Sequence, residues 1–132
     1  MSCPTEQKEV KIDKNLANSL AAESEKKIAT ANAIKLNDIT ASSKLCLVYD
    51  ALRGLLEATA IEKGFKLYNH ECYCAFLKEI LKETNMGDDF DKFKKTRNSI
   101  NYYGKSLSIA EAEITIKGML RLIERLKQLK DR

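Results

Sequence analysis

Apolar side chains recur every three or four residues along most of the chain, which is the spacing of helices that bury one face. The clearest run predicts a helix from about Thr40 to Lys63, and Gly64 occupies a position where a glycine commonly ends a helix. The stripe of this helix consists of Leu45, Val48, Leu52, Leu55, Leu56 and Thr59. No segment shows the strict apolar and polar alternation that predicts a strand.

Two more long helices are predicted near the ends of the chain. The first runs from about Glu6 to Leu36. Its imperfect apolar stripe consists of Leu16, Leu20, Ile28, Ala31 and Ile34. The last begins at Ser108, because Ser108 and Glu111 have the spacing of a capping box. Its predicted buried positions are Ala112, Ile116, Met119, Leu120, Ile123 and Leu126.

The segment between these helices predicts two more. A third helix begins near Asn69 or His70. Its apolar stripe consists of Tyr73, Phe76, Leu77, Ile80 and Leu81. The stretch TNMGDDF predicts a turn that leads into a short fourth helix. Asp88, Asp89 and Asp91 open this helix, and their negative charges suit a helix N-terminus.

The connections between these segments are short, so successive helices are expected to be antiparallel. The sequence therefore predicts an all-α fold, an antiparallel up-and-down helical bundle of four main helices plus a short fifth. Residues 1–132 are expected to form one domain, in which residues 1–7 are disordered or frayed.

A chain of 132 residues can bury about two-thirds of its unfolded surface, which is enough for a core without disulfides. No apolar stretch approaches the ~18 residues of a membrane span, and no signal peptide is apparent. We therefore predict a cytoplasmic location and no membrane partner. The net charge of +4 is mild and does not by itself indicate nucleic acid.

The four cysteines raise the question of disulfides or metal. They are Cys3, Cys46, Cys72 and Cys74, without CxxC spacing. The run His70-x-Cys72-x-Cys74 has a metal-like composition, but on a helix the two cysteines would point about 200° apart. We therefore expect thiols without a bound metal, and no cofactor.

The stretch KKTRNSINYYGKSLS, residues 94 to 108, departs from the generic helical pattern. The apolar stripe of the fourth helix runs through Phe90, Phe93 and Ile100, and Arg97 occupies the intervening position on the same face. A buried guanidinium is costly unless it is paired or lines a wet cleft.

Two further polar positions accompany this arginine. Asn101 lies one helical turn after Arg97, and Tyr102 lies one turn after Asn98. Two explanations of the patch remain open at this point. Arg97 is either part of a functional site or a core charge paired with a carboxylate such as Glu57 or Glu83.

The stretch RNSINYYG after a short amphipathic helix resembles the motif of the HEPN domains (higher eukaryotes and prokaryotes nucleotide-binding), of the small stand-alone type found in archaea and bacteria. In that motif an arginine is followed by a polar residue and, four to six residues on, by a histidine. The stretches SKLCLVYDALRGLLEATAIEKGFKLYNHECYCAFLKEIL and GKSLSIAEAEITIKGMLRLIERLK resemble the family's second, third and final helices. The resemblance covers roughly residues 8 to 130, although only the arginine motif is specific.

The resemblance assigns Arg97 and Asn98 to the motif's arginine and its polar neighbour. The motif histidine is missing, because Tyr102 and then Tyr103 occupy its place, which leaves a degenerate R-N-x3-Y motif. Members with an intact motif are metal-independent ribonucleases, several of them toxins paired with a minimal nucleotidyltransferase antitoxin. The resemblance also implies a homodimer in which two motif helices meet across one cleft.

Tyrosine is a poor substitute for the histidine as a base, because its pKa is about 10 and lowering it to 7 requires roughly 4 kcal/mol. A neutral phenol can still donate a proton or stack on a base. Our first hypothesis is therefore a nucleotide- or RNA-binding protein with weakened or lost cleavage, in which Arg97, Asn98, Asn101, Tyr102 and Tyr103 hold the ligand and Glu57 and His70 support them.

Two alternatives remain. The first is an active metal-independent endoribonuclease that uses Arg97 together with Tyr102, or with His70 recruited from the other subunit of a dimer. The second is a structural module for protein interactions, in which Arg97 is a satisfied core charge.

Overall fold

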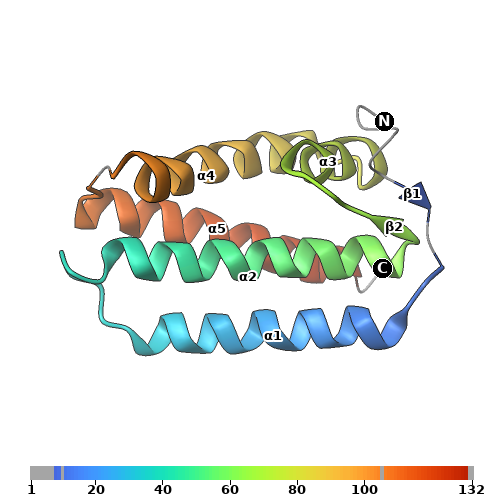
Figure 1. Ribbon diagram of the computed structural model, residues 1–132, viewed down its shortest axis with the longest axis horizontal. Helices are drawn as coiled ribbons and strands as arrows, with labels where there is room; N and C mark the ends of the chain where they lie inside the picture. The colour runs from blue at the N-terminus through green and yellow to red at the C-terminus, as the bar shows by residue number, and fades with distance from the viewer. Residues whose placement is uncertain (1–7, 10, 105, 131–132) are drawn as a thin grey trace.

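The computed structural model describes residues 8–9, 11–104 and 106–130, and the expectation for residues 1–7 lies outside this range. It contains four long helices, which are α1 (Lys14–Ala33), α2 (Ala41–Glu62), α4 (Thr84–Tyr103) and α5 (Ile109–Lys130). A short helix, α3 (His70–Ala75), continues into one π-helical turn, η1 (Phe76–Ile80). Successive long helices run in opposite directions (Figure 1), which confirms the predicted all-α, up-and-down bundle.

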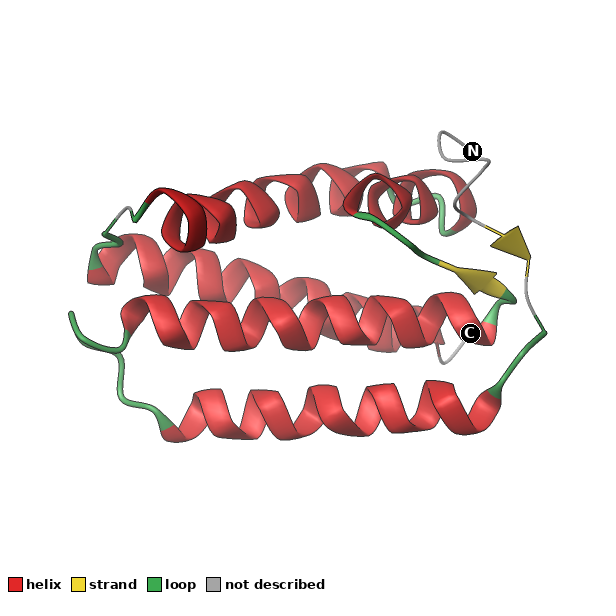
Figure 2. Cartoon of the chain, viewed as in Figure 1, coloured by secondary structure: helices red, strands yellow, loops and turns green. Residues whose placement is uncertain are grey.

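Two very short strands accompany the helices (Figure 2). β1 (Lys8–Glu9) pairs antiparallel with β2 (Phe65–Lys66), so that Lys8 lies opposite Lys66 and Glu9 opposite Phe65. No strand was expected from the sequence. With two residues on each side, this ladder leaves the helical class of the fold unchanged.

Helix α2 forms the centre of the bundle, since it packs against α1, α4 and α5. The predicted stripe is buried at every position: Leu45, Val48, Leu52, Leu55, Leu56 and Thr59. The helix ends as expected, because Gly64 follows Lys63 with a φ of 84°, a left-handed conformation that glycine adopts at little cost.

Helix α1 is shorter than predicted, and its predicted stripe is confirmed only in part, since Ala31 is buried and Leu20 and Ile28 pack against the core. It begins at Lys14, where the Asp13 side chain accepts a hydrogen bond of 3.0 Å from the Leu16 amide. Its fully buried residues are small ones seven positions apart, Ala17, Ser24 and Ala31, whereas Leu16 is 41% exposed. The two helices approach closely at this seam, because a Cβ on Gly54 of α2 would lie 2.7 Å from the Ser24 hydroxyl.

The short segment of the bundle is the third and not the fourth, contrary to the prediction. The stretch TNMGDDF is not a turn but the first two turns of α4, which is 20 residues long. Met86 and Phe90, four positions apart, are both buried and hold this stretch in a helix despite its turn-like composition. The chain turns earlier, at Lys82, whose φ is 60°.

The start of α5 is as predicted. The Ser108 hydroxyl accepts a hydrogen bond of 3.1 Å from the Glu111 amide. Of its predicted stripe, Leu120 is half-buried and the other five positions are buried. None of the helices among the described residues combines the length and apolar character required to span a membrane.

Candidate anion-binding site

A cavity of about 270 Å³ lies where α2, α4 and the start of α3 meet. Its described lining consists of Tyr49, Arg53, Tyr68, Asn69, His70, Tyr73, Lys94, Arg97 and Asn98. Each helix contributes residues three or four positions apart, which therefore share one helical face. The cavity thus collects side chains from three elements that are distant in sequence.

One buried ring holds the aromatic part of this lining in place. Phe90 of α4 is fully buried, and its centroid lies 5.6 Å from that of Tyr49, 5.2 Å from that of His70 and 5.7 Å from that of Tyr73. The Tyr49 and His70 rings are stacked on it, with interplanar angles of 17° and 16°. These contacts restrict the rings, so the wall of the cavity is preorganised.

Arg97 lies against this wall with few polar partners. Its side chain is 24% exposed, and its guanidinium carbon is 5.4 Å from the centroid of the Tyr49 ring, a cation–π contact. The nearest carboxylate oxygen, Asp50 Oδ1, is 3.9 Å from Nη2, which is too far for a hydrogen bond. Arg97 Nε is buried and has no hydrogen-bond partner within the described part of the chain.

This geometry differs from the alternative in which Arg97 is a core charge paired with Glu57 or Glu83. The expected partners of Arg97 were Glu57 or Glu83, but Glu83 accepts a 3.0 Å hydrogen bond from Arg125 instead. Arg97 instead approaches the carboxylate of Asp50, which lies one helical turn before the lining residue Arg53. Arg97 is therefore only weakly compensated by the protein.

The charge of the lining is one-sided. Arg53, Lys94 and Arg97 are cationic, whereas none of the nine described lining residues is acidic. Cationic side chains around one concave site favour an anion, and the guanidinium groups match the oxygens of a phosphate. The arrangement is therefore suited to holding a phosphate-bearing ligand.

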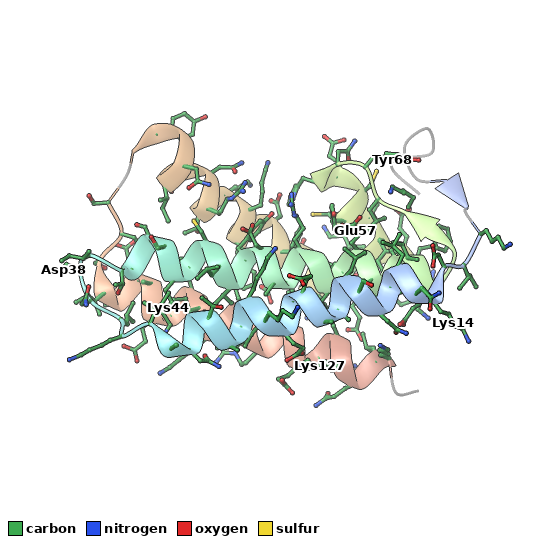
Figure 3. The ribbon with its side chains drawn as sticks, turned by 60° about the horizontal axis from the view of Figure 1, so that its bottom comes forward. Lys14, Asp38, Lys44, Glu57, Tyr68 and Lys127 are labelled. Carbon is green, nitrogen blue, oxygen red and sulfur yellow. The ribbon has the colours of Figure 1, made fainter. Side chains whose placement is uncertain are left out.

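Tyr68 supplies an aromatic ring at the edge of the cavity. It is 53% exposed, unlike the buried Tyr49 and Tyr73. In Figure 3 it lies at the border of the molecule beside α3, on the side away from Lys127 of α5. An exposed ring next to a cationic cavity is the arrangement on which a nucleobase can stack.

His70 is the lining residue whose ordinary pKa lies near neutrality. Burial lowers its pKa, and the hydrogen bond with Asp91 opposes this effect. Nε2 lies 3.1 Å from Asp91 Oδ1, and Nδ1 is buried without a partner among the described residues. The neutral ring therefore carries its proton on Nε2, where the carboxylate accepts it.

Two tyrosines of the lining are poor acids in this setting. Burial raises the pKa of Tyr49 to about 12, although Arg53 and Arg97 act in the opposite direction. Burial, followed by the charge of Glu57, also raises the pKa of Tyr73. Both phenols are therefore neutral at physiological pH, and neither serves as a base.

The structure brings together only some of the residues that the sequence singled out. Arg97, Asn98 and His70 line one cavity within a single chain, whereas Asn101 and Tyr103 do not line it. Asn101 is exposed and accepts a hydrogen bond of 3.6 Å from the Cys46 thiol, and Tyr103 is 82% exposed.

The remaining two predicted residues have no described place in the cavity. Tyr102 belongs to α4, but its side chain lies outside what the structure describes. Glu57 is not among the described lining residues, although its charge contributes to the raised pKa of Tyr73.

Six lining residues were not identified from the sequence, namely Tyr49, Arg53, Tyr68, Asn69, Tyr73 and Lys94. One signal was available for Arg53, since it lies one turn after Tyr49 and therefore shares its helical face. The signal for Lys94 was its position one turn before Asn98 in the arginine motif.

The cysteines agree only partly with the expectation of thiols. Cys46 and Cys74 are free, whereas Cys72 is disulfide-bonded, and Cys3 lies outside the described residues. The prediction of thiols is therefore wrong for Cys72, and the cytoplasmic location, which partly depended on it, stays a prediction.

Comparisons with known proteins leave the site to be judged from its own chemistry. No protein-family model matches the chain, no curated protein matches it, and no solved structure matches it.

Proposed function

We propose that this chain binds nucleotide or RNA through the cationic cavity around Arg97, with weakened or lost ribonuclease activity. The observation that carries the proposal is the described lining itself, in which three cations and four tyrosine or histidine rings converge and none of the nine residues is acidic. Arg97 Nε adds to it, because a phosphate oxygen supplies the acceptor that the described residues do not. The resemblance of RNSINYYG to the HEPN motif supports the same ligand class.

Cleavage is the weaker alternative, although His70 and Arg97 do share one cavity. A general base must reach the proton of the 2′-hydroxyl directly or through one water. One nitrogen of His70 is engaged by Asp91, and the other is buried. The site therefore favours binding over proton transfer.

Titration of a labelled single-stranded RNA oligonucleotide at low salt tests the proposal. We expect Arg97→Ala to weaken binding about tenfold or more, since a charge-assisted hydrogen bond contributes about 1.5–3 kcal/mol. Arg121→Ala is the matched control, because Arg121 is an exposed arginine of α5 outside this cavity. Equal weakening by both variants would indicate nonspecific attraction and would contradict the proposal.

A second assay separates binding from cleavage. Wild-type protein is incubated with the oligonucleotide in chelator at neutral pH, and we expect little or no cleavage. Cleavage that disappears in His70→Asn and persists in Tyr102→Phe would favour the ribonuclease alternative.

The proposal includes a homodimer in which the α4 helices of two copies meet. Asn101 and Tyr103 are exposed near the end of α4, where a second copy would bring them toward the ligand. Sedimentation at micromolar concentration tests this arrangement, and a monomer would remove it. We retain the cytoplasmic location that was predicted from the sequence. A minimal nucleotidyltransferase partner follows from the resemblance, and co-purification with a neighbouring gene product of that class tests it.

A further inference from the structure

His70 also lines a second cavity, of about 430 Å³, between α3, η1 and α4. Cys74 and Asp91 line it as well. One potential metal-ligating atom from each of these three residues lies within 4.8 Å of the other two. The cluster is partly buried and is separate from the arginine motif.

Two of the three distances are those of ligands around one small cation. Nε2 of His70 lies 3.1 Å from Asp91 Oδ1 and 3.4 Å from Cys74 Sγ. Tetrahedral Zn²⁺ has bonds of about 2.0–2.2 Å to nitrogen and oxygen and about 2.3 Å to sulfur, which separates the ligands by about 3.3 Å (N to O) and about 3.5 Å (N to S). The third separation, between the ligand atoms of Cys74 and Asp91, is no more than 4.8 Å.

The protein already orients these ligands. His70 and Cys74 are four positions apart and therefore share one helical face. Phe90 stacks on the imidazole and restricts its plane. Lys95 binds Asp91 Oδ2 at 3.0 Å, which leaves Oδ1 beside His70. Such outer contacts are what fixes the ligands of protein metal sites.

Hydrogen bonding alone does not explain why all three side chains lie so close together. A neutral imidazole carries one proton, which on Nε2 goes to Asp91. The Cys74 sulfur nevertheless lies 3.4 Å from the same nitrogen, where a hydrogen bond to it contributes little to stability. A cation engages all three atoms at once, and one thiolate and one carboxylate neutralise its two charges.

We infer that His70, Cys74 and Asp91 form a binding site for Zn²⁺, with three protein ligands and an open fourth position toward the cavity. A nitrogen, a sulfur and an oxygen donor suit Zn²⁺ better than Mg²⁺ or Ca²⁺, which prefer oxygen alone. The site was not predicted from the sequence, because the prediction considered the angle between Cys72 and Cys74 and not the shared helical face of His70 and Cys74. The inference shares His70 with the anion-binding cavity but goes beyond the proposed function.

Titration of the chelator-treated full-length protein with Zn²⁺ against a chromophoric competitor tests the inference. We expect one equivalent to bind wild type. Cys74→Ser and Asp91→Asn should each weaken binding roughly tenfold or more, because even outer-contact residues of metal sites contribute 10–100-fold. Cys46→Ser is the matched control, since Cys46 is also a free cysteine and is also partly buried. It should bind as wild type does.

Co²⁺ provides a second readout that reports sulfur ligation directly. Wild type and Cys46→Ser should show thiolate-to-cobalt charge-transfer absorption, and Cys74→Ser should lack it while keeping its helical circular dichroism. Absence of stoichiometric Zn²⁺ binding in wild type, or unchanged affinity in both Cys74→Ser and Asp91→Asn, would overturn the inference. Neither result bears on oligonucleotide binding at Arg97, so the two proposals fail separately.

Discussion

Replacing Arg97 by methionine separates a binding arginine from a structural one. Methionine keeps an unbranched apolar stem and favours helices, but it removes the guanidinium. An arginine with a structural role stabilises the fold, whereas an arginine that serves only to bind a ligand contributes to affinity and not to stability. The two explanations therefore predict opposite effects on stability and on affinity.

The effect on stability follows from the contacts of Arg97. The substitution removes the 3.9 Å approach to Asp50, of a kind worth about 0–1 kcal/mol, and the cation–π contact with Tyr49, worth about 0.5–2 kcal/mol. It also removes the buried Nε that lacks a partner among the described residues, at a gain of about 1–3 kcal/mol. The opposing contributions are of similar size, so we expect the free energy of unfolding to change by less than about 1 kcal/mol, or about 4 °C in Tm.

The effect on binding is expected to be larger. Loss of one charge-assisted contact to phosphate costs about 1.5–3 kcal/mol, which is about 10–150-fold in Kd. Thermal unfolding followed by circular dichroism measures the first quantity, and oligonucleotide titration measures the second. Arg121→Met is the control for both. A loss of more than 3 kcal/mol in stability, with affinity unchanged, would refute this reasoning, because breaking a buried structural ion pair costs about 3–5 kcal/mol.

Substitutions at Tyr68, Tyr102 and Phe90 give three further predictions. Tyr68→Ala should weaken oligonucleotide binding by about 1–3 kcal/mol, because a stacking ring is lost, while leaving the binding of inorganic phosphate unchanged in calorimetry. Tyr102→His should create or raise RNA cleavage in chelator, and its absence would argue against the geometry of the HEPN motif. Tyr102→Phe should leave the affinity for the oligonucleotide unchanged. Phe90→Ala should cost about 3–5 kcal/mol in denaturant unfolding, against less for the partly buried Phe93→Ala, since Phe90 supports three rings.

The sequence predicted those helices whose apolar periodicity agrees with their tertiary packing. The stripe of α2 is central and large, and the observed bounds, Ala41–Glu62, differ by one residue from the expected ones at each end. In α1 the fully buried residues are small, so the predicted stripe of larger apolar residues contained only one of them, Ala31. At the start of α4, the glycine and aspartates resembled a turn, but the burial of Met86 and Phe90 determined a helix.

The candidate site could be predicted from the sequence only in part, for a related reason. The spacing of Phe90, Phe93 and Ile100 placed Arg97 on the inner face, and its side chain lines a cavity as a result. Arg53 and His70 come from other helices, and no local spacing reveals that α2 and α3 meet α4 at this level. The motif instead suggested Asn101 and Tyr103, which lie beyond the cavity because the helix continues past it.

The position of His70 between two cavities makes its possible roles mutually exclusive. Ligation of Zn²⁺ through Nε2 transfers the ring proton to Nδ1, so neither nitrogen retains a lone pair for a 2′-hydroxyl. A metal-loaded protein therefore cannot use His70 as a base, whereas the metal-free ring keeps a buried lone pair on Nδ1. Zinc binding and His70-dependent cleavage thus oppose one another. The cationic lining formed by Arg53, Lys94 and Arg97 depends on neither and continues to favour an anion in both states.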